Sequence, residues 1–122
     1  MVKPTLLVIE PDHDIADALR TYLSKSYKII WTQSAAEAIA LTGKKTFDAV
    51  VLELALGNQH SGLEFLHEFK SYPDTLLIPV IVLSQQQLDE ISLKSLGVTA
   101  YLYKPQASLE QVAAIIAKAL QS

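Results

Sequence analysis

Four short apolar stretches of the sequence each lead into a polar residue that could take part in chemistry: Glu10, Glu53, Ser84 and Lys104. Such runs, rich in Val, Ile and Leu, are typical of strands in a parallel sheet that is buried on both faces. Ligands of such sheets bind beyond the carboxyl ends of the strands. Asp12 closely follows the first run and adds a third carboxylate. The pattern therefore predicts an acidic pocket, with a hydroxyl and an ammonium, at one edge of a sheet.

The elements that must position these residues alternate between strand-like and helix-like stretches, five of each. Asp12 or Asp14 can cap the first helix, Ser34 begins a capping box for the second, and Ser108 can cap the last. Gly97 suits the C-terminal end of the fourth and weakest helix. The apolar positions that predict this fourth helix are Leu88, Ile91 and Leu96. The alternation predicts an α/β fold with a parallel sheet, formed by residues 1–122 as a single domain.

Composition excludes several classes of function. The chain has 122 residues, of which 50% are hydrophobic and 19% are charged, and it has no cysteine and a net charge of −3. Disulfides, thiolate catalysis and zinc–thiolate sites are therefore excluded. The basic residues are dispersed, which argues against nucleic-acid binding. No apolar run approaches the ~20 residues that span a bilayer, and the N-terminus lacks the pattern of a signal peptide. We expect a cytoplasmic protein that does not bind membranes.

In their order and spacing, five stretches of the chain together resemble the receiver domain of bacterial response regulators, the CheY-like family. They are residues 6–12, 48–54, 61–66, 78–84 and 97–105. The resemblance implies a flavodoxin-like, doubly wound (βα)5 fold with five parallel strands in the order 2-1-3-4-5. It also implies two-component signal transduction or a phosphorelay, in which a histidine kinase phosphorylates an aspartate after the third strand with Mg²⁺ bound.

Several residues match the family's pocket, and others depart from it. Ser84, Tyr101 and Lys104 match the hydroxyl, switch-aromatic and lysine positions, and the match implies a cis bond between Lys104 and Pro105. Glu53 stands at the phosphoacceptor position.

The acidic pair after the first strand falls on Glu10 and Pro11, so one carboxylate is lost. A glutamate is one methylene longer than an aspartate, and a misplaced nucleophile is costly for phosphoryl transfer. Only Glu10 and Glu53 remain as weak candidate metal ligands. We therefore expect no cofactor, and weak or absent Mg²⁺ binding.

The pocket residues also have simpler interpretations. Glu53 can be a polar residue that closes a strand, Ser84 can bond to the backbone, and Tyr101 can be a half-buried strand aromatic. Lys104 can be a surface lysine. The alternative that we favour places the Lys104 ammonium beside Glu53, where it relieves the repulsion between two carboxylates.

The last helix is unusually apolar and predicts an interface. The positions expected to face inward are Leu109, Val112, Ala113, Ile116 and Leu120, and those expected on the remaining faces include Ala114, Ile115, Ala117 and Ala119. A solvated helix would usually be more polar. We expect Tyr103, Ala114, Ile115 and Lys118 to form a protein interface, which could also support a homodimer through the fifth strand and the last helix.

Together these features predict an atypical receiver, or pseudo-receiver, which is not an enzyme and which acts by contact with a histidine kinase or an output protein. One alternative is a phosphate-responsive receiver that binds Mg²⁺ through Glu10, Glu53 and Asp12. Another is a small flavodoxin-like cofactor-binding protein or enzyme, although the chain has no Gly-rich phosphate-cradling motif.

Overall fold

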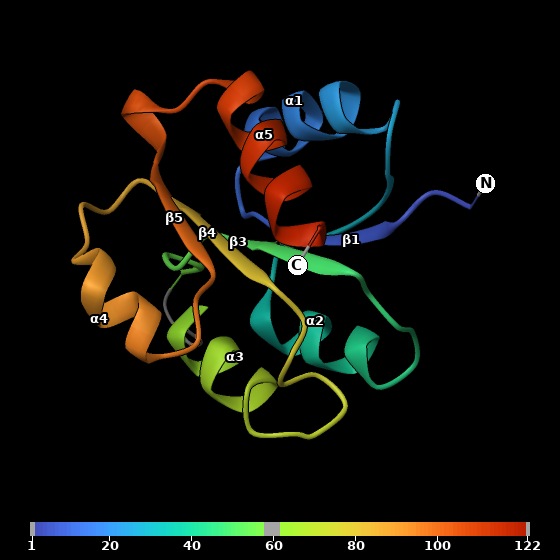
Figure 1. The fold of residues 1–122 in the computed structure, drawn as a ribbon, viewed down its shortest axis with the longest axis vertical. Coiled ribbons are helices and arrows are strands. Elements are labelled where there is room, and N and C mark those ends of the chain that lie inside the picture. Colours follow the sequence, from blue (N-terminus) through green and yellow to red (C-terminus); the bar gives the residue numbers. More distant parts are fainter. Residues whose placement is uncertain (1, 58–61, 122) are drawn as a thin grey trace.

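The computed structural model describes residues 2–57 and 62–121 (Figure 1). The elements are β1 (Thr5–Ile9), α1 (His13–Leu23), β2 (Lys28–Thr32), α2 (Ala35–Thr42), β3 (Ala49–Leu52), α3 (Gly62–Phe69), β4 (Val80–Ser84), α4 (Glu90–Ser95), β5 (Ala100–Tyr103), the 3₁₀ turn η1 (Lys104–Gln106) and α5 (Leu109–Leu120). All four strand pairings are parallel, and the order is β2-β1-β3-β4-β5. The predicted fold class and strand order are confirmed.

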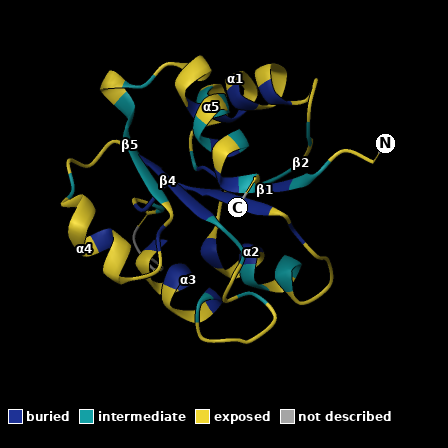
Figure 2. Cartoon of the chain, viewed as in Figure 1, coloured by how far each residue is buried: buried dark blue, intermediate teal, exposed yellow. Residues whose placement is uncertain are grey.

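The sheet lies between two layers of helices, which is why its central strands are apolar throughout. Leu7 and Val50 face the core beneath α2, α3 and α4, while Leu6 and Val51 face the core beneath α1 and α5. Alternate side chains of a strand point to opposite faces. Every residue of β3 and β4 is therefore buried, and most helices expose one side and bury the other (Figure 2).

The helix ends follow local sequence signals. Asp12, not Asp14, caps α1 by accepting from the amides of residues 14 and 15, at 2.8 and 3.1 Å. Ser34 accepts from the amide of Glu37, and Ser108 forms a capping box with Gln111. Each cap provides an acceptor for amides that have no partner inside the helix.

Gly97 ends α4 as predicted. It has φ +94°, its amide donates to Lys94 O, and the amide of Val98 donates to Leu93 O. This pair of bonds is a Schellman motif, which needs a residue in the left-handed region. The apolar positions that indicated this helix do not form its buried side, however, because Ile91 is 80% exposed and Leu93 is the buried residue. The helix has only six residues, so too few positions were available to establish its orientation from periodicity.

No helix within the described residues is long and apolar enough to cross a membrane.

Candidate functional site

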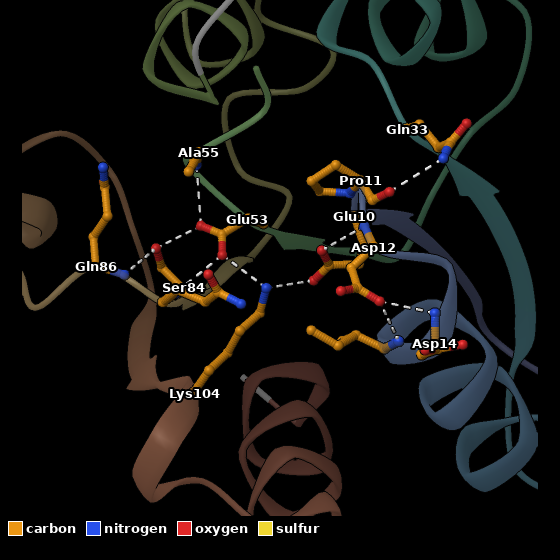
Figure 3. Close-up of polar contacts among 12 residues, drawn as sticks. Glu10, Pro11, Asp12, Asp14, Gln33, Glu53, Ala55, Ser84, Gln86 and Lys104 are labelled. Atoms are coloured by element: carbon orange, nitrogen blue, oxygen red, sulfur yellow. Dashed lines mark hydrogen bonds and ion pairs between the residues drawn. The ribbon is translucent and has the colours of Figure 1, made fainter.

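The register of the sheet brings the polar ends of three strands and one turn together. Leu52 of β3 pairs with both Ile9 of β1 and Val82 of β4, so the residues that follow these strands meet at the same edge. The amide of Glu53 donates to the carbonyl of Ile9 at 3.0 Å, which extends the pairing by one step. Lys104 begins η1, directly after β5, and its side chain points back between the two glutamates (Figure 3).

Lys104 bridges the two buried carboxylates. Its Nζ lies 2.6 Å from Glu10 Oε1 and 2.7 Å from Glu53 Oε1. The side chains are 10% exposed for Lys104, 3% for Glu10 and 2% for Glu53. The predicted contact between Lys104 and Glu53 is present, and the bridge to Glu10 places both carboxylates on one ammonium. We call these three residues the ion-pair cluster.

Glu53 is the most thoroughly bonded member of the cluster. Besides Lys104, its carboxylate accepts from Ser84 Oγ at 2.5 Å and from the amides of Gln85 at 2.9 Å and Ala55 at 3.0 Å. Burial alone would raise the pKa of Glu53, but the hydrogen bonds from Lys104, Ser84 and the two amides outweigh it and hold the pKa below its usual value. Glu53 is therefore a stable carboxylate whose two oxygens are both held by donors.

Glu10 has fewer donors and a different protonation behaviour. Its carboxylate accepts from Lys104 and from the amide of Asp12 at 3.1 Å. Burial raises the pKa of Glu10, and the bonds from Lys104 and the Asp12 amide offset this only in part. The two glutamates on the same ammonium are therefore unlike: Glu53 retains its charge more strongly, and Glu10 takes up a proton first as the pH falls.

Asp12 does not join the ion-pair cluster through its side chain, contrary to the predicted acidic pocket of three carboxylates. Its Oδ1 accepts from the first amides of α1, and the residue is exposed. Only its backbone amide contacts Glu10. Local geometry explains the difference, because a cap must face the amides two and three residues later in the chain.

Ser84 and Tyr101 lie on one path of hydrogen bonds. Ser84 Oγ donates to Glu53 and accepts from the amide of Gln86 at 3.1 Å. The hydroxyl of Tyr101 donates to the carbonyl of Gln86 at 2.7 Å and accepts from the amide of Leu88 at 3.1 Å. This path connects Glu53 with an aromatic side chain of the edge strand through the backbone that follows β4. Sequence reasoning missed its Gln86 and Leu88 groups, because backbone amides and carbonyls leave no signal in residue type.

The predicted cis bond between Lys104 and Pro105 was wrong, since no cis peptide occurs in residues 2–57 or 62–121. Pro105 lies in the first turn of η1, and the amide of Ala107 closes this turn on the carbonyl of Lys104 at 3.1 Å. Proline suits the first turn of a helix because its missing amide would have had no partner there.

The predicted interface does not form one exposed face. Ala114 and Lys118 are exposed, but Tyr103 and Ile115 are half-buried, and Ile115 packs on the core beneath α5. Ala114 instead borders a groove of about 460 Å³ beside the end of α1, whose lining includes Tyr22, Tyr27 and Ala117.

Two of the positions expected in α5 are also corrected. Ala119 is buried, and Leu109 is 36% exposed. The rotation of α5 is set by Val112 and Ile116, which lie deepest in the core.

Comparisons with known proteins agree on one family. A family model for the response regulator receiver domain matches residues 6–116. The regulatory protein VanR of Enterococcus faecium is 28% identical over 116 residues, which cover 93% of this chain and 48% of VanR. The response regulator SaeR of Staphylococcus aureus is 33% identical over 110 residues, which cover 88% of this chain and 46% of SaeR. The chain thus spans about half the length of these two relatives.

A crystal structure of a putative response regulator from Chloroflexus aurantiacus has the same fold. Its TM-score is 0.89, at 23% identity, with 98% of this chain and 99% of that chain covered.

Proposed function

We propose that this chain, which belongs to the response regulator receiver domain family, acts in two-component signal transduction by binding a protein partner, without phosphorylation of an aspartate in its pocket. The partner would be a histidine kinase or an output protein, and the chain itself would not be an enzyme. The observation that carries this proposal is the bridge from Lys104 to Glu10 and Glu53.

The bonding of Glu53 opposes its use as a phosphoacceptor. By resemblance it stands at the acceptor position, but one oxygen faces Lys104 and Gln85 and the other faces Ser84 and Ala55. An attacking oxygen must be free to approach phosphorus in line with the leaving group. An attack by Glu53 would require one of its oxygens to lose both of its hydrogen-bond donors. The extra methylene of a glutamate would also displace that oxygen from the in-line position.

The side chains of this pocket do not suit the binding of Mg²⁺. The ion prefers a near-octahedral shell of oxygen ligands, in which one or two protein carboxylates usually take part. Glu10 and Glu53 each present an oxygen to Lys104 already, Pro11 has no side-chain oxygen, and Asp12 caps α1. Within residues 2–57 and 62–121, no cluster of three or more His, Cys, Asp or Glu side chains could hold a metal ion. An ammonium thus supplies the cation in this pocket.

A permanently charged Glu53 would hold the domain in one arrangement. Its bond to Ser84 continues through Gln86 to Tyr101, so the loop after β4 is tied to the pocket at one end and to β5 at the other. A receiver of this kind would present one constant surface to its partner. Tyr101 would keep one position and would not switch with phosphorylation.

Intact-mass measurement with a small-molecule phosphodonor and Mg²⁺ tests the proposal. We expect the wild-type mass to stay unchanged. The double variant Glu53→Asp with Pro11→Asp is the matched control, because it restores the acceptor and the missing carboxylate and should gain one phosphoryl group if the donor is active. A wild-type adduct that maps to the pocket and is lost in Glu53→Gln would refute the proposal and favour the phosphate-responsive alternative.

A further inference from the structure

Two side chains at the end of β2 bind the loop that carries Glu10. The indole Nε1 of Trp31 donates to the carbonyl of Glu10 at 2.8 Å. The amide Nε2 of Gln33 donates to the carbonyl of Pro11 at 3.1 Å, as Figure 3 shows. The loop between β1 and α1 therefore has side-chain donors on two consecutive carbonyls, one from β2 and one from the residue that follows it.

The indole itself is held on two sides. The ring of His13 meets it edge-on, with centroids 5.1 Å apart, and the guanidinium carbon of Arg20 lies 5.1 Å from the ring centroid. Gln33 Nε2 also lies 3.1 Å from His13 Nε2, so these side chains form one connected group. Trp31 is half-buried, whereas His13, Arg20 and Gln33 are exposed. The group thus runs from the surface to the backbone of the loop.

This arrangement fixes the direction of the Glu10 side chain. The amide of Glu10 donates to the carbonyl of Thr32 at 3.0 Å, and its carbonyl accepts from Trp31. The peptide groups on both sides of the Glu10 Cα are therefore anchored to β2. Since a peptide group is planar, anchoring both of them leaves little freedom in the direction of Cβ. The pairing of β1 with β2 cannot by itself fix the direction of the Glu10 side chain, because the ladder between these strands ends at Ile9 and Thr32.

We propose that Trp31 and Gln33 are positioning residues for Glu10, which hold its carboxylate over Lys104 by binding the two loop carbonyls. The exposed surface formed by His13, Arg20 and Gln33 is then coupled to the buried ion-pair cluster. The placement of Glu10 by these two residues does not depend on whether the pocket accepts a phosphoryl group.

The test is the titration of the Glu10 carboxyl, followed by NMR of protein labelled with ¹³C at the glutamate carboxyl groups. The Glu10 signal is identified by its loss in Glu10→Gln. Trp31→Phe keeps an aromatic ring beside His13 and Arg20 but removes the indole N–H. With the loop released, the carboxyl gains water, and we expect its titration midpoint to move down from its raised position towards the ordinary glutamate value of 4.5.

The matched control is Ile29→Val, two residues earlier on the same face of β2, which packs in the same core cluster as Trp31 without touching the loop carbonyls. It should leave the Glu10 midpoint unchanged. Gln33 is exposed, so Gln33→Ala should fold like wild type. It should shift the Glu10 midpoint in the same direction as Trp31→Phe but less, because the carbonyl that Gln33 binds belongs to Pro11, one residue beyond Glu10.

The inference is overturned if Trp31→Phe leaves the Glu10 midpoint where it is in wild type, raises it, or shifts it no more than Ile29→Val does. The phosphodonor experiment has a separate readout, so failure of either proposal can be recognised independently.

Discussion

Replacing Lys104 with methionine would remove the only cation of the ion-pair cluster while keeping the length of the side chain. Glu10 and Glu53 would then face each other, at 3% and 2% exposure, without the ammonium that now contacts both. A buried charge that has lost its partner is strongly destabilising. Because methionine fills much the same space as lysine, the expected loss of stability comes from charge and not from a cavity.

Two estimates of the magnitude agree. Two unit charges about 5 Å apart repel by about 3 kcal/mol at an effective dielectric constant of about 20. The folded variant can avoid this repulsion by protonating one carboxyl. With an ordinary glutamate pKa of 4.5 in the unfolded chain, that proton costs about 3.4 kcal/mol at about pH 7 and only about 0.7 kcal/mol at about pH 5. We therefore expect Lys104→Met to lower the free energy of unfolding by about 3 kcal/mol near pH 7, and by less than about 1 kcal/mol near pH 5.

Urea unfolding followed by circular dichroism at both pH values measures this difference, and an unchanged m-value supports the two-state comparison. Lys28→Met is the matched control, since Lys28 is an exposed residue of the edge strand β2 and should lose little stability at either pH. Glu53→Gln should cost less than Lys104→Met, because it leaves Lys104 paired with Glu10. The reasoning fails if the loss for Lys104→Met does not shrink between pH 7 and pH 5, or if it is no larger than that of Glu53→Gln.

Five further outcomes are expected. Relative to Glu10→Gln, wild type should lose stability as the pH rises from 4.5 through the raised pKa of Glu10, because the folded state holds that proton more tightly. Relative to Glu53→Gln, wild type should lose stability as the pH falls below 4.5 through the lowered pKa of Glu53. Both statements would be contradicted if the free energy of unfolding, measured by urea melts, changed equally with pH in wild type and variant. Gly62→Ala should cost about 1–3 kcal/mol, because its Cβ would lie 2.6 Å from the Cα of the residue after Glu53; a melt like that of wild type would show that α3 moves away freely. Pro11→Asp should strengthen Mg²⁺ binding in calorimetric titration, and no change would mean that Lys104 still excludes the ion. Ala114→Arg should disrupt self-association or partner capture in light scattering or pull-down, with little change in melting temperature; identical association of two folded proteins would place the interface elsewhere.

The fold could be predicted from sequence because its signals are local. Apolar runs such as residues 80–83 mark buried strands, and residues such as Ser108 and Gly97 mark helix ends through bonds that span only a few positions. The short helix α4 was the exception, because Ile91, one of the apolar positions that indicated it, is exposed and Leu93 is buried. Six residues do not define a face, so packing against the core determined its orientation.

For the pocket, the sequence determined which residues are present, and tertiary structure decided how they are bonded. Glu10, Glu53, Ser84 and Lys104 had to meet, because the carboxyl ends of parallel strands share one edge of a sheet. The bridge from Lys104 to both glutamates depends on positions that residue type does not encode. Residue type allowed either Asp12 or Asp14 to cap α1, and the structure decided for Asp12.

The hydrogen bonds from Trp31 and Gln33 to the loop that carries Glu10 were the part of the site that sequence could predict least. Trp31 lies 21 positions from the Glu10 carbonyl that it binds, and nothing in either residue marks the partnership. Composition and periodicity report what a segment of chain prefers, whereas a hydrogen bond between two segments depends on distances of a few ångströms that only the packed sheet sets. The sequence by itself thus determined a receiver fold with an acidic pocket, and the tertiary structure decided which carboxylate retains its charge and which side chains hold the other in place.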